Sequence, residues 1–282
     1  MSFMFSSPPG AHERMLALCE LARLHAESGD RITAVDLCRQ ALALEHDCLP
    51  AHLILAGIGL SGEHYRDLLE KVHRHFCPRT YLEIGVGDGS LLALADAVTL
   101  AIGVDAAADF GERKFAAQVR VFRETSDAFF AKHDVSAEFG GKPLDLALVH
   151  GVHAFEDALR TFINVERISG TDTRILIHDC YPLDETTASR RQGTTFWTGD
   201  LWKLIVCLKK YRPDLDVRTF AAPPSGLTMI RHPDPQSQVL SAEYDAICRE
   251  FIPLPYAALA IDKRAALNLV AGDWETVRGH LA

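Results

Sequence analysis

The feature that most constrains the fold is a regular alternation of short β-branched runs with helical stretches between residues 78 and 232. Such alternation is typical of parallel βαβ units. Seven strands are predicted, at 80–84, 100–105, 119–124, 144–150, 174–178, 216–220 and 227–231. Helices are predicted between them at 89–98, 111–117, 154–168 and 199–210. The sequence therefore predicts an α/β fold with a doubly wound, mostly parallel seven-stranded sheet. No helix fits between the last two strands, which predicts an antiparallel hairpin at one edge.

The two ends of the chain have a helical period instead. Apolar residues recur at three- and four-residue steps from residue 11 onward, with a break at Gly29-Asp30 that predicts a helical hairpin. A third helix is predicted at 51–60, and residues 236–282 are helical again. These changes divide the chain into a helical region at 1–75, a sheet domain at 76–235 and a helical extension at 236–282.

Composition excludes several classes of protein. The 282 residues carry 29 Lys and Arg against 38 Asp and Glu, a net charge of −9, which disfavours nucleic acid as a partner. The seven cysteines are scattered without a Cys-x-x-Cys pair, so neither a disulfide scaffold nor a zinc ribbon is expected. No uncharged apolar run approaches about 18 residues, and the N-terminus lacks a secretory pattern. We expect a cytoplasmic protein with no membrane span.

The strongest local motif is a glycine loop that directly follows the first predicted strand, with Gly85, Gly87 and Gly89 at alternate positions. Glycines there allow a tight turn and let a ligand lie against bare backbone. Asp105 ends the next strand, about twenty residues after the first glycine, where an acid can accept the ribose hydroxyls of an adenosine. Ser90 stands where a nicotinamide fingerprint has its third glycine, which disfavours a nicotinamide oxidoreductase.

Together, Glu83, the glycine loop and Asp105 resemble the first motifs of the class I S-adenosylmethionine-dependent methyltransferases. The segments 144–156 and 175–182 resemble one branch, the methyltransferase domains grouped with macrocin O-methyltransferase and cephalosporin hydroxylase-like proteins. The resemblance covers roughly residues 75–232. It implies a Rossmann-like methyltransferase sheet and S-adenosylmethionine as cofactor.

The same resemblance implies which residues bind the cofactor. It assigns the methionine end to Glu83, Gly85, Gly87 and Gly89, the ribose to Asp105, and the adenine to the segment that begins with Ser126 and Asp127. Asp127 could instead, or in addition, be the N-cap of the helix that follows.

Four side chains that suit proton transfer or metal binding lie at predicted strand ends: His150, His153, His178 and Asp179. Methyl transfer is an in-line displacement on an activated donor, so the protein must align the acceptor and remove a proton from a hydroxyl. His153 is the first candidate for this base, because imidazole titrates near neutral pH. A role in positioning a loop is the alternative. Asp179 could orient the base or bind a metal, with His178 beside it.

A divalent metal is an open question in the sequence. Macrocin-type relatives bind magnesium through acids after the fourth and fifth strands, but this chain has His150 or Val152 where the first acid would stand, and Cys180 after Asp179. That set disfavours magnesium, which prefers oxygen ligands. His150, His153 and Asp179 could instead suit zinc, iron or nickel.

The polar segment 181–197 is long enough to be a lid or binding loop. Arg190 and Arg191 could clamp an anionic acceptor, or could be a solvated pair. Trp197 and Trp202 could cover the acceptor or pack in the core. Asp200 is predicted to cap the helix that follows it.

The leading hypothesis is an S-adenosylmethionine-dependent O-methyltransferase that acts on a small-molecule hydroxyl, of a natural product or a sugar. N-methylation on the same fold is an alternative. A non-catalytic, cofactor-binding module that uses its helical ends for protein interaction is another. A metal-dependent hydroxylase is also compatible with the branch. The N-terminal hairpin resembles a single tetratricopeptide unit, and the helical ends could form a homodimer or bind a protein partner.

Overall fold

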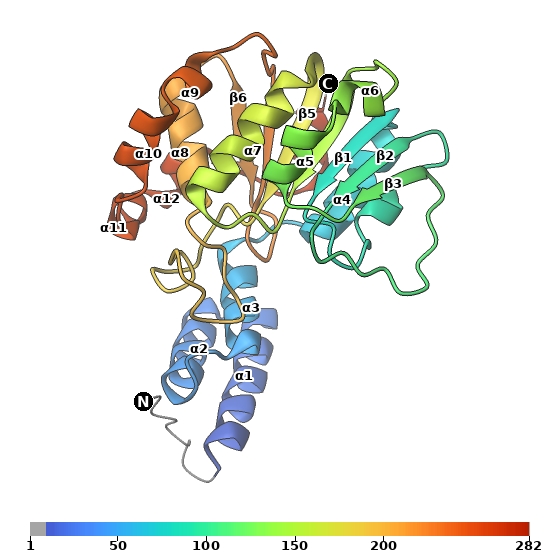
Figure 1. The fold of residues 1–282 in the computed structure, drawn as a ribbon. Coiled ribbons are helices and arrows are strands. Elements are labelled where there is room, and N and C mark those ends of the chain that lie inside the picture. Colours follow the sequence, from blue (N-terminus) through green and yellow to red (C-terminus); the bar gives the residue numbers. More distant parts are fainter. Residues whose placement is uncertain (1–9, 282) are drawn as a thin grey trace, which may run out of the picture.

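A computed structural model describes residues 10–281 and contains one eight-stranded sheet in the order β3-β2-β1-β4-β5-β7-β6-β8 (Figure 1). The strands are β1 (Thr80–Ile84), β2 (Leu100–Val104), β3 (Gln118–Phe122), β4 (Leu144–Val149), β5 (Ser169–His178), β6 (Asp216–Phe220), β7 (Leu227–Arg231) and β8 (Leu269–Val270). Strands β1 to β5 pair in parallel, while β7 runs antiparallel to both β5 and β6. The predicted fold class is confirmed, and the short β8 adds an eighth strand.

The order of the strands determines where a site can form. The chain proceeds outward from β1 through β2 to β3, then returns to place β4 on the other side of β1. At such a switch point the loops after the two central strands diverge and leave a crevice at their carboxyl ends. Ile84 at the end of β1 pairs with Val104 and with Val149, so the residues after all three strands meet at one edge.

Helices cover both faces of the sheet (Figure 1). One face packs against α5 (Ser126–Lys132), α7 (Phe155–Arg167) and α8 (Trp202–Tyr211), whose apolar side chains join those of Leu82 and Ile84. The other face packs against α4 (Tyr65–Phe76) and α13 (Trp274–Gly279), together with Tyr81. Because side chains alternate along a strand, the two cores are lined by alternate residues of β1.

Three N-terminal helices, α1 (Ala11–Glu27), α2 (Arg31–Leu44) and α3 (Leu49–Gly59), form a separate projection with its own small core (Figure 1). The predicted break is present: Gly29 has φ 88° and the Asp30 side chain accepts from the Thr33 N–H. Helix α4 belongs to the core of the sheet domain. The three helices of this projection therefore end at Gly59, and α4 packs with the sheet.

The C-terminal region is part of the sheet domain as well. Helices α9 (Val239–Ala242), α10 (Tyr244–Phe251), α11 (Tyr256–Ala260) and α12 (Lys263–Ala266) precede β8, which pairs with β6, and α13 covers the sheet.

Two predicted helices are absent. Residues 89–98 contain only the 3₁₀ turn η1 (Leu92–Leu94), and residues 111–117 form turns. The positive φ angles of the glycine loop prolong the turn after β1, and Ala95 is already extended. The helices predicted at 154–168 and 199–210 are present as α7 and α8, and the short α6 (Val135–Glu138) is additional.

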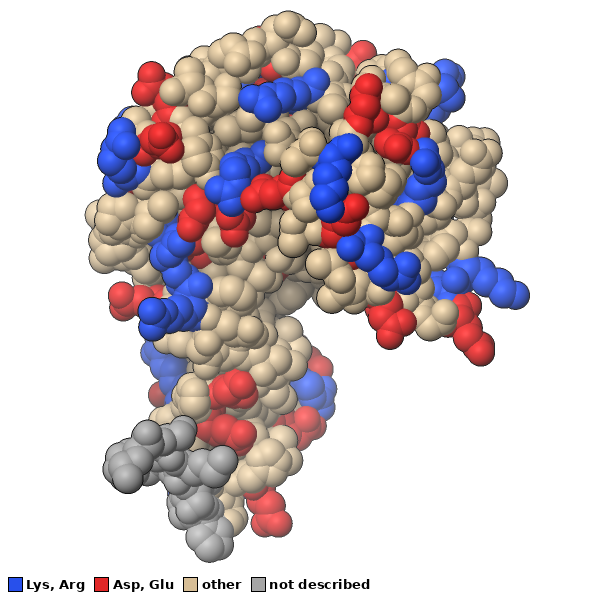
Figure 2. Space-filling view, in the orientation of Figure 1, with Lys and Arg blue, Asp and Glu red and all other residues tan. Residues whose placement is uncertain are grey.

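The surface carries mixed charges. On the face shown in Figure 2, basic and acidic side chains alternate over the sheet domain, and acidic side chains are conspicuous on the helical projection. Within residues 10–281, no helix is both long and apolar enough to cross a membrane.

Candidate functional site

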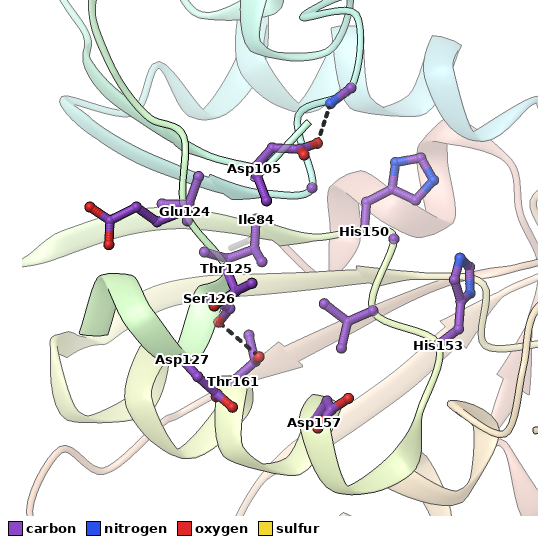
Figure 3. Close-up of a pocket in the computed structure, with 16 residues that line it drawn as sticks. Ile84, Asp105, Glu124, Thr125, Ser126, Asp127, His150, His153, Asp157 and Thr161 are labelled. Atoms are coloured by element: carbon purple, nitrogen blue, oxygen red, sulfur yellow. Dashed lines mark hydrogen bonds between the residues drawn. The ribbon is translucent and has the colours of Figure 1, made fainter. Parts of the chain in front are cut away.

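A cavity of about 570 Å³ opens at the carboxyl edge of the sheet, between the ends of β1, β2 and β4 and the first turns of α5 and α7 (Figure 3). Its walls combine bare backbone at Gly85 and Gly87 with polar side chains such as Asp105, Ser126 and His153. The switch point of the sheet and the cavity coincide, and seven of the residues singled out in the sequence line it: Gly85, Gly87, Asp105, Ser126, Asp127, His150 and His153.

The glycines of the loop have different structural roles. All three have positive φ angles, 82° at Gly85, 53° at Gly87 and 74° at Gly89. A Cβ at Gly85 would lie 1.9 Å from the backbone oxygen of His150, so this glycine lets β1 and β4 continue side by side. A Cβ at Gly87 would meet nothing within 4 Å, and Gly87 lines the cavity. Gly85 therefore allows close backbone packing, and Gly87 leaves space for a ligand.

Asp105 connects the glycine loop to β2. One carboxylate oxygen accepts from the Gly87 N–H at 2.7 Å and the other accepts from the Ala107 N–H at 2.7 Å (Figure 3). Each oxygen of a carboxylate has a second lone pair, so Asp105 can still accept from a ligand hydroxyl while it holds both turns. The residue lines the cavity, as predicted for a ribose-binding acid.

Glu83 lies elsewhere. Its side chain is fully buried on the α4 side of the sheet, accepts from the Tyr81 hydroxyl at 2.8 Å and does not line the cavity. Burial raises the pKa of this carboxyl group to about 8. The structure does not bring the Glu83 side chain to the expected cofactor site.

The wall predicted to contact adenine comes from the start of α5. Thr125, which the sequence analysis did not single out, is the N-cap and accepts from the Ala128 N–H. The Ser126 hydroxyl lies 3.0 Å from that of Thr161, and Asp127 forms an ion pair with Arg160 at 3.0 Å. Asp127 therefore is not the helix cap. A threonine just before a helix is itself a capping signal, which could have identified Thr125.

His153 lines the cavity on the α7 side. Its Nδ1 lies 3.2 Å from the carbonyl oxygen of Thr198, and its ring packs against Trp197 with centroids 4.5 Å apart. A carbonyl can only accept, so Nδ1 carries the proton and Nε2 carries the lone pair. Within the described residues, Nε2 has no hydrogen-bond partner and is available to a ligand.

A second group of side chains lies beside the cavity: one potential ligand atom each from His150, His178 and Asp179, all within 4.8 Å of one another. His150 Nε2 is 3.6 Å and His178 Nδ1 is 3.2 Å from the Asp179 carboxylate, and the Ser225 hydroxyl donates to that carboxylate at 2.6 Å. His153 is not a member of this group. The group therefore contains His178 in place of His153, because β5 brings His178 beside His150.

The charges within this group differ. Burial, and then the neighbouring His178, lowers the pKa of His150 to about 4. Burial alone would raise the pKa of Asp179, but His178, His150 and the Ser225 hydroxyl outweigh it and hold this pKa well below its ordinary value. At neutral pH the group thus contains a neutral His150 and an ionised Asp179.

The predicted acceptor residues are dispersed. Arg190 forms ion pairs with Glu156 at 2.6 Å and Asp200 at 2.7 Å, whereas Arg191 is exposed. Trp202 is buried in the core on the α8 side of the sheet, and only Trp197 adjoins a cavity residue, through His153.

Asp200 has a role that the sequence analysis did not foresee. Its carboxylate accepts from the backbone N–H of Phe155 and therefore caps α7, not α8 as predicted.

The segment 181–200 is packed against both helical ends. Thr195 donates its hydroxyl to Asp47 at 2.9 Å, and Phe196 stacks on His52 with centroids 5.7 Å apart. Lys263 donates to the carbonyl oxygen of Pro182 at 2.8 Å. The segment forms a braced wall behind His153.

No protein-family model and no curated protein matches this chain. Among solved structures, it is similar to the O-methyltransferase TomG from Streptomyces achromogenes, involved in tomaymycin synthesis and solved in complex with SAM, with 15% identity over 60% of this chain and 79% of that chain and a TM-score of 0.44. A protein from Klebsiella pneumoniae, provisionally named an O-methyltransferase, has 12% identity, the same coverage of both chains and a TM-score of 0.43. At these values the function has to be argued from the site itself.

Proposed function

We propose that this protein is an S-adenosylmethionine-dependent methyltransferase that methylates a hydroxyl group of a small molecule, of the natural-product or sugar class. One observation carries the proposal: Gly87 and Asp105 adjoin each other at the wall of a single cavity, at the switch point of the sheet. Bare backbone there can accommodate the amino-acid part of the cofactor, and the carboxylate can accept from its ribose.

The structure of the turn after β1 favours S-adenosylmethionine over a dinucleotide as the cofactor. Dinucleotide sites place the pyrophosphate at the N-terminus of the helix that follows the glycine loop. Here β1 is followed by the three-residue 3₁₀ turn η1, which offers no such helix end. S-adenosylmethionine carries no phosphate and does not need one. The absence of a helix in this turn, added to Ser90 in the motif, favours S-adenosylmethionine over a nicotinamide cofactor.

In this proposal the cofactor extends along the cavity wall. Gly85 and Gly87 lie at its methionine end, Asp105 binds the ribose, and the first turn of α5 at Thr125 and Ser126 contacts the adenine. Ser126 is already oriented by Thr161, and Thr125 by its capping bond, so this wall is formed before a ligand binds. The cofactor supplies an activated methyl group when it is bound.

His153 is the base in the proposed reaction. The Thr198 carbonyl holds the Nδ1–H tautomer, which directs the Nε2 lone pair away from the braced wall and leaves it available to remove the acceptor proton. Trp197 restrains the plane of the ring. Methylation of a nitrogen nucleophile would need the same alignment but less help from a base, so the effect of a His153 substitution distinguishes O- from N-methylation.

Calorimetric titration with S-adenosylhomocysteine tests the cofactor assignment. We expect micromolar binding by the native protein and binding about 10- to 100-fold weaker in Asp105→Asn, since a hydrogen bond to a charged group contributes about 1.5–3 kcal/mol. Asp109→Asn is the matched control, because Asp109 is an exposed acid in the same loop that does not line the cavity.

A second experiment tests the proposed base. The variant His153→Gln should bind S-adenosylhomocysteine as the native protein does but lose transfer of labelled methyl groups to a panel of hydroxylated compounds.

The result also decides the alternative function. If the native protein binds no S-adenosylhomocysteine, the methyltransferase proposal fails and an interaction role for the helical unit becomes the better reading. That unit exposes several large apolar side chains, including Ile32 at 87% and Leu24 at 48% exposure. Equal binding by Asp105→Asn and the native protein would instead remove Asp105 from the cofactor site.

A further inference from the structure

The hydrogen bonds around His150, His178 and Asp179, at the ends of β4 and β5, determine where the protons of this group lie. Ser225 donates its only hydroxyl proton to Asp179, so its oxygen can only accept from the Nε2 of His178, which lies 3.1 Å away. His178 Nε2 therefore carries a proton. The other ring nitrogen, Nδ1, is buried and lies 3.2 Å from an Asp179 oxygen, where it forms an ion pair if the ring is doubly protonated and is a free lone pair if it is not.

A neutral His178 would thus direct a lone pair at a carboxylate oxygen. Two acceptors that face each other in a buried site repel, unless the ring carries a second proton or a cation lies between them. His150 Nε2 lies 3.6 Å from the second oxygen of Asp179, beyond hydrogen-bond distance, and is a third potential ligand atom. A cation bound at this point would satisfy all three atoms at once.

We propose that His150, His178 and Asp179 bind a divalent transition-metal ion through His150 Nε2, His178 Nδ1 and the carboxylate. Two imidazoles and one carboxylate suit zinc, iron(II) or cobalt(II), whereas magnesium prefers an all-oxygen set. Zinc bonds of about 2.0–2.1 Å in a tetrahedral site place neighbouring ligand atoms roughly 3.4 Å apart. His178 Nδ1 lies 3.2 Å from one Asp179 oxygen and His150 Nε2 lies 3.6 Å from the other, and the three potential ligand atoms all lie within 4.8 Å of one another.

The surroundings hold the ligands in place. Asp179 has a left-handed backbone with φ 63°, a conformation that is costly for a residue other than glycine and recurs at functional sites. Tyr65 stacks on the His178 ring with centroids 3.8 Å apart, and Ser225 fixes the outer nitrogen of that ring. Hydrogen bonds to the outer nitrogen of a ligating histidine are the usual means of orienting it.

The site is closed on one side and open on the other. The side chains of His178 and Asp179 are 4% and 12% exposed, while His150 is 28% exposed and lines the cavity. Three protein ligands leave at least one coordination position for an external oxygen, as in catalytic zinc sites. That position would face the cavity in which an acceptor hydroxyl could bind. The site does not depend on the cofactor assignment, because its ligands come only from this group.

The test is metal binding by the whole chain without any cofactor. After treatment with a chelator, the protein should bind one equivalent of zinc in calorimetry and give the strong visible absorption of low-coordinate cobalt(II). Histidine nitrogen shifts should change at Nδ1 of His178 and at Nε2 of His150. Magnesium should neither bind at similar concentrations nor displace cobalt.

Variants locate the site. Asp179→Asn, which has nearly the same shape, and His150→Ala should each weaken zinc binding at least about 100-fold, and Ser225→Ala about 10-fold, within the range for loss of an outer hydrogen bond. His153→Ala should bind zinc as the native protein does, because His153 lies outside the group. Thermal unfolding confirms that each variant is folded. Absence of stoichiometric zinc or cobalt binding by the native protein would overturn the proposal, as would equal loss in His153→Ala. S-adenosylhomocysteine binding tests the methyltransferase proposal separately.

Discussion

The two sides of the cavity are built differently. On the β1–β2 side, the chain presents mainly backbone, and the contact that shapes it joins residues only 18 apart, Gly87 and Asp105. On the β4–β5 side, side chains face one another, and the contacts span longer stretches of chain, 45 residues from His153 to Thr198 and 46 from Asp179 to Ser225. A local sequence motif is enough to specify the β1–β2 side. The β4–β5 side depends on how the sheet assembles, so a substitution there changes contacts with residues that are distant in sequence.

The substitution expected to lower the free energy of unfolding most is at Gly85, where the two sides of the cavity touch. Gly85→Ala would place a Cβ 1.9 Å from the His150 carbonyl oxygen, in a left-handed backbone, and neither strand can move away. We expect a loss of about 5 kcal/mol or more in the free energy of unfolding, at the extreme of single substitutions. Gly87→Ala, with a similar φ but free space, should cost only about 1–2 kcal/mol.

Urea unfolding of the two glycine variants measures this difference. Similar stabilities would show that β1 and β4 do not pack through Gly85 as closely as described. The comparison also separates stability from binding, since Gly87→Ala should remain folded while it narrows the proposed cofactor site.

A smaller change in stability, one that depends on pH, is expected from Glu83 on the strand that precedes the glycine loop. Burial raises the pKa of this group to about 8 in the folded protein, above the ordinary value of 4.5. The folded state therefore binds the proton more tightly than the unfolded state. The stability it contributes is fully present below pH 4.5 and is lost as the pH rises through 8, on the order of 5 kcal/mol in all.

Glu83→Gln keeps the shape of the side chain and removes its titration. Melting temperatures measured from pH 5 to pH 9 should fall more steeply for the native protein than for the variant, which should be the more stable of the two at pH 9. Parallel curves would mean that Glu83 is ionised in the folded protein and that its environment is more polar than its burial implies.

The smallest effect is expected on the β4–β5 side, in the pair of arginines. Arg190 bridges Glu156 and the buried Asp200, whose other oxygen caps α7. Arg190→Gln should cost about 1 kcal/mol, because Arg190 is partly exposed and Asp200 keeps Lys203 as a partner. Arg191→Gln, an exposed control, should stay within about 0.5 kcal/mol of the native protein.

Chemical denaturation of the two arginine variants decides between a structural role and the acceptor clamp that the sequence suggested. If Arg191→Gln destabilises the protein as much as Arg190→Gln, the bracing of α7 does not depend on Arg190.

The hydrophobic periodicity and the glycine-loop motif predicted much of the fold and part of the candidate site. The seven strands, the edge hairpin, α7 and α8 follow from hydrophobic spacing, and Gly87 and Asp105 were placed together by the motif alone. The helix at 89–98 was wrong because apolar spacing does not show that three glycines have positive φ angles. The amphipathic spacing of α4 does not show which core that helix joins.

The remaining differences come from long-range geometry. The burial of Glu83 depends on which face of β1 it occupies, and Asp200 caps α7 because the 181–200 segment returns to it. His178 joins His150 because β4 and β5 are neighbours in the sheet. Spacing along the chain contains none of these relations, so His153, nearer to His150 in sequence, was preferred.

The braced segment behind His153 has a practical consequence for anyone who shortens the chain. Asp47, in the turn before α3, contacts it from the N-terminal side of the sheet domain in sequence, and Lys263 of α12 contacts it from the C-terminal side. Deleting residues 1–60 removes the Asp47 anchor, and ending the chain before residue 263 removes the other. A trimmed version could retain the sheet and the glycine loop and still lose the backing of its histidine. Expression boundaries for this protein should therefore be drawn outside both helical regions.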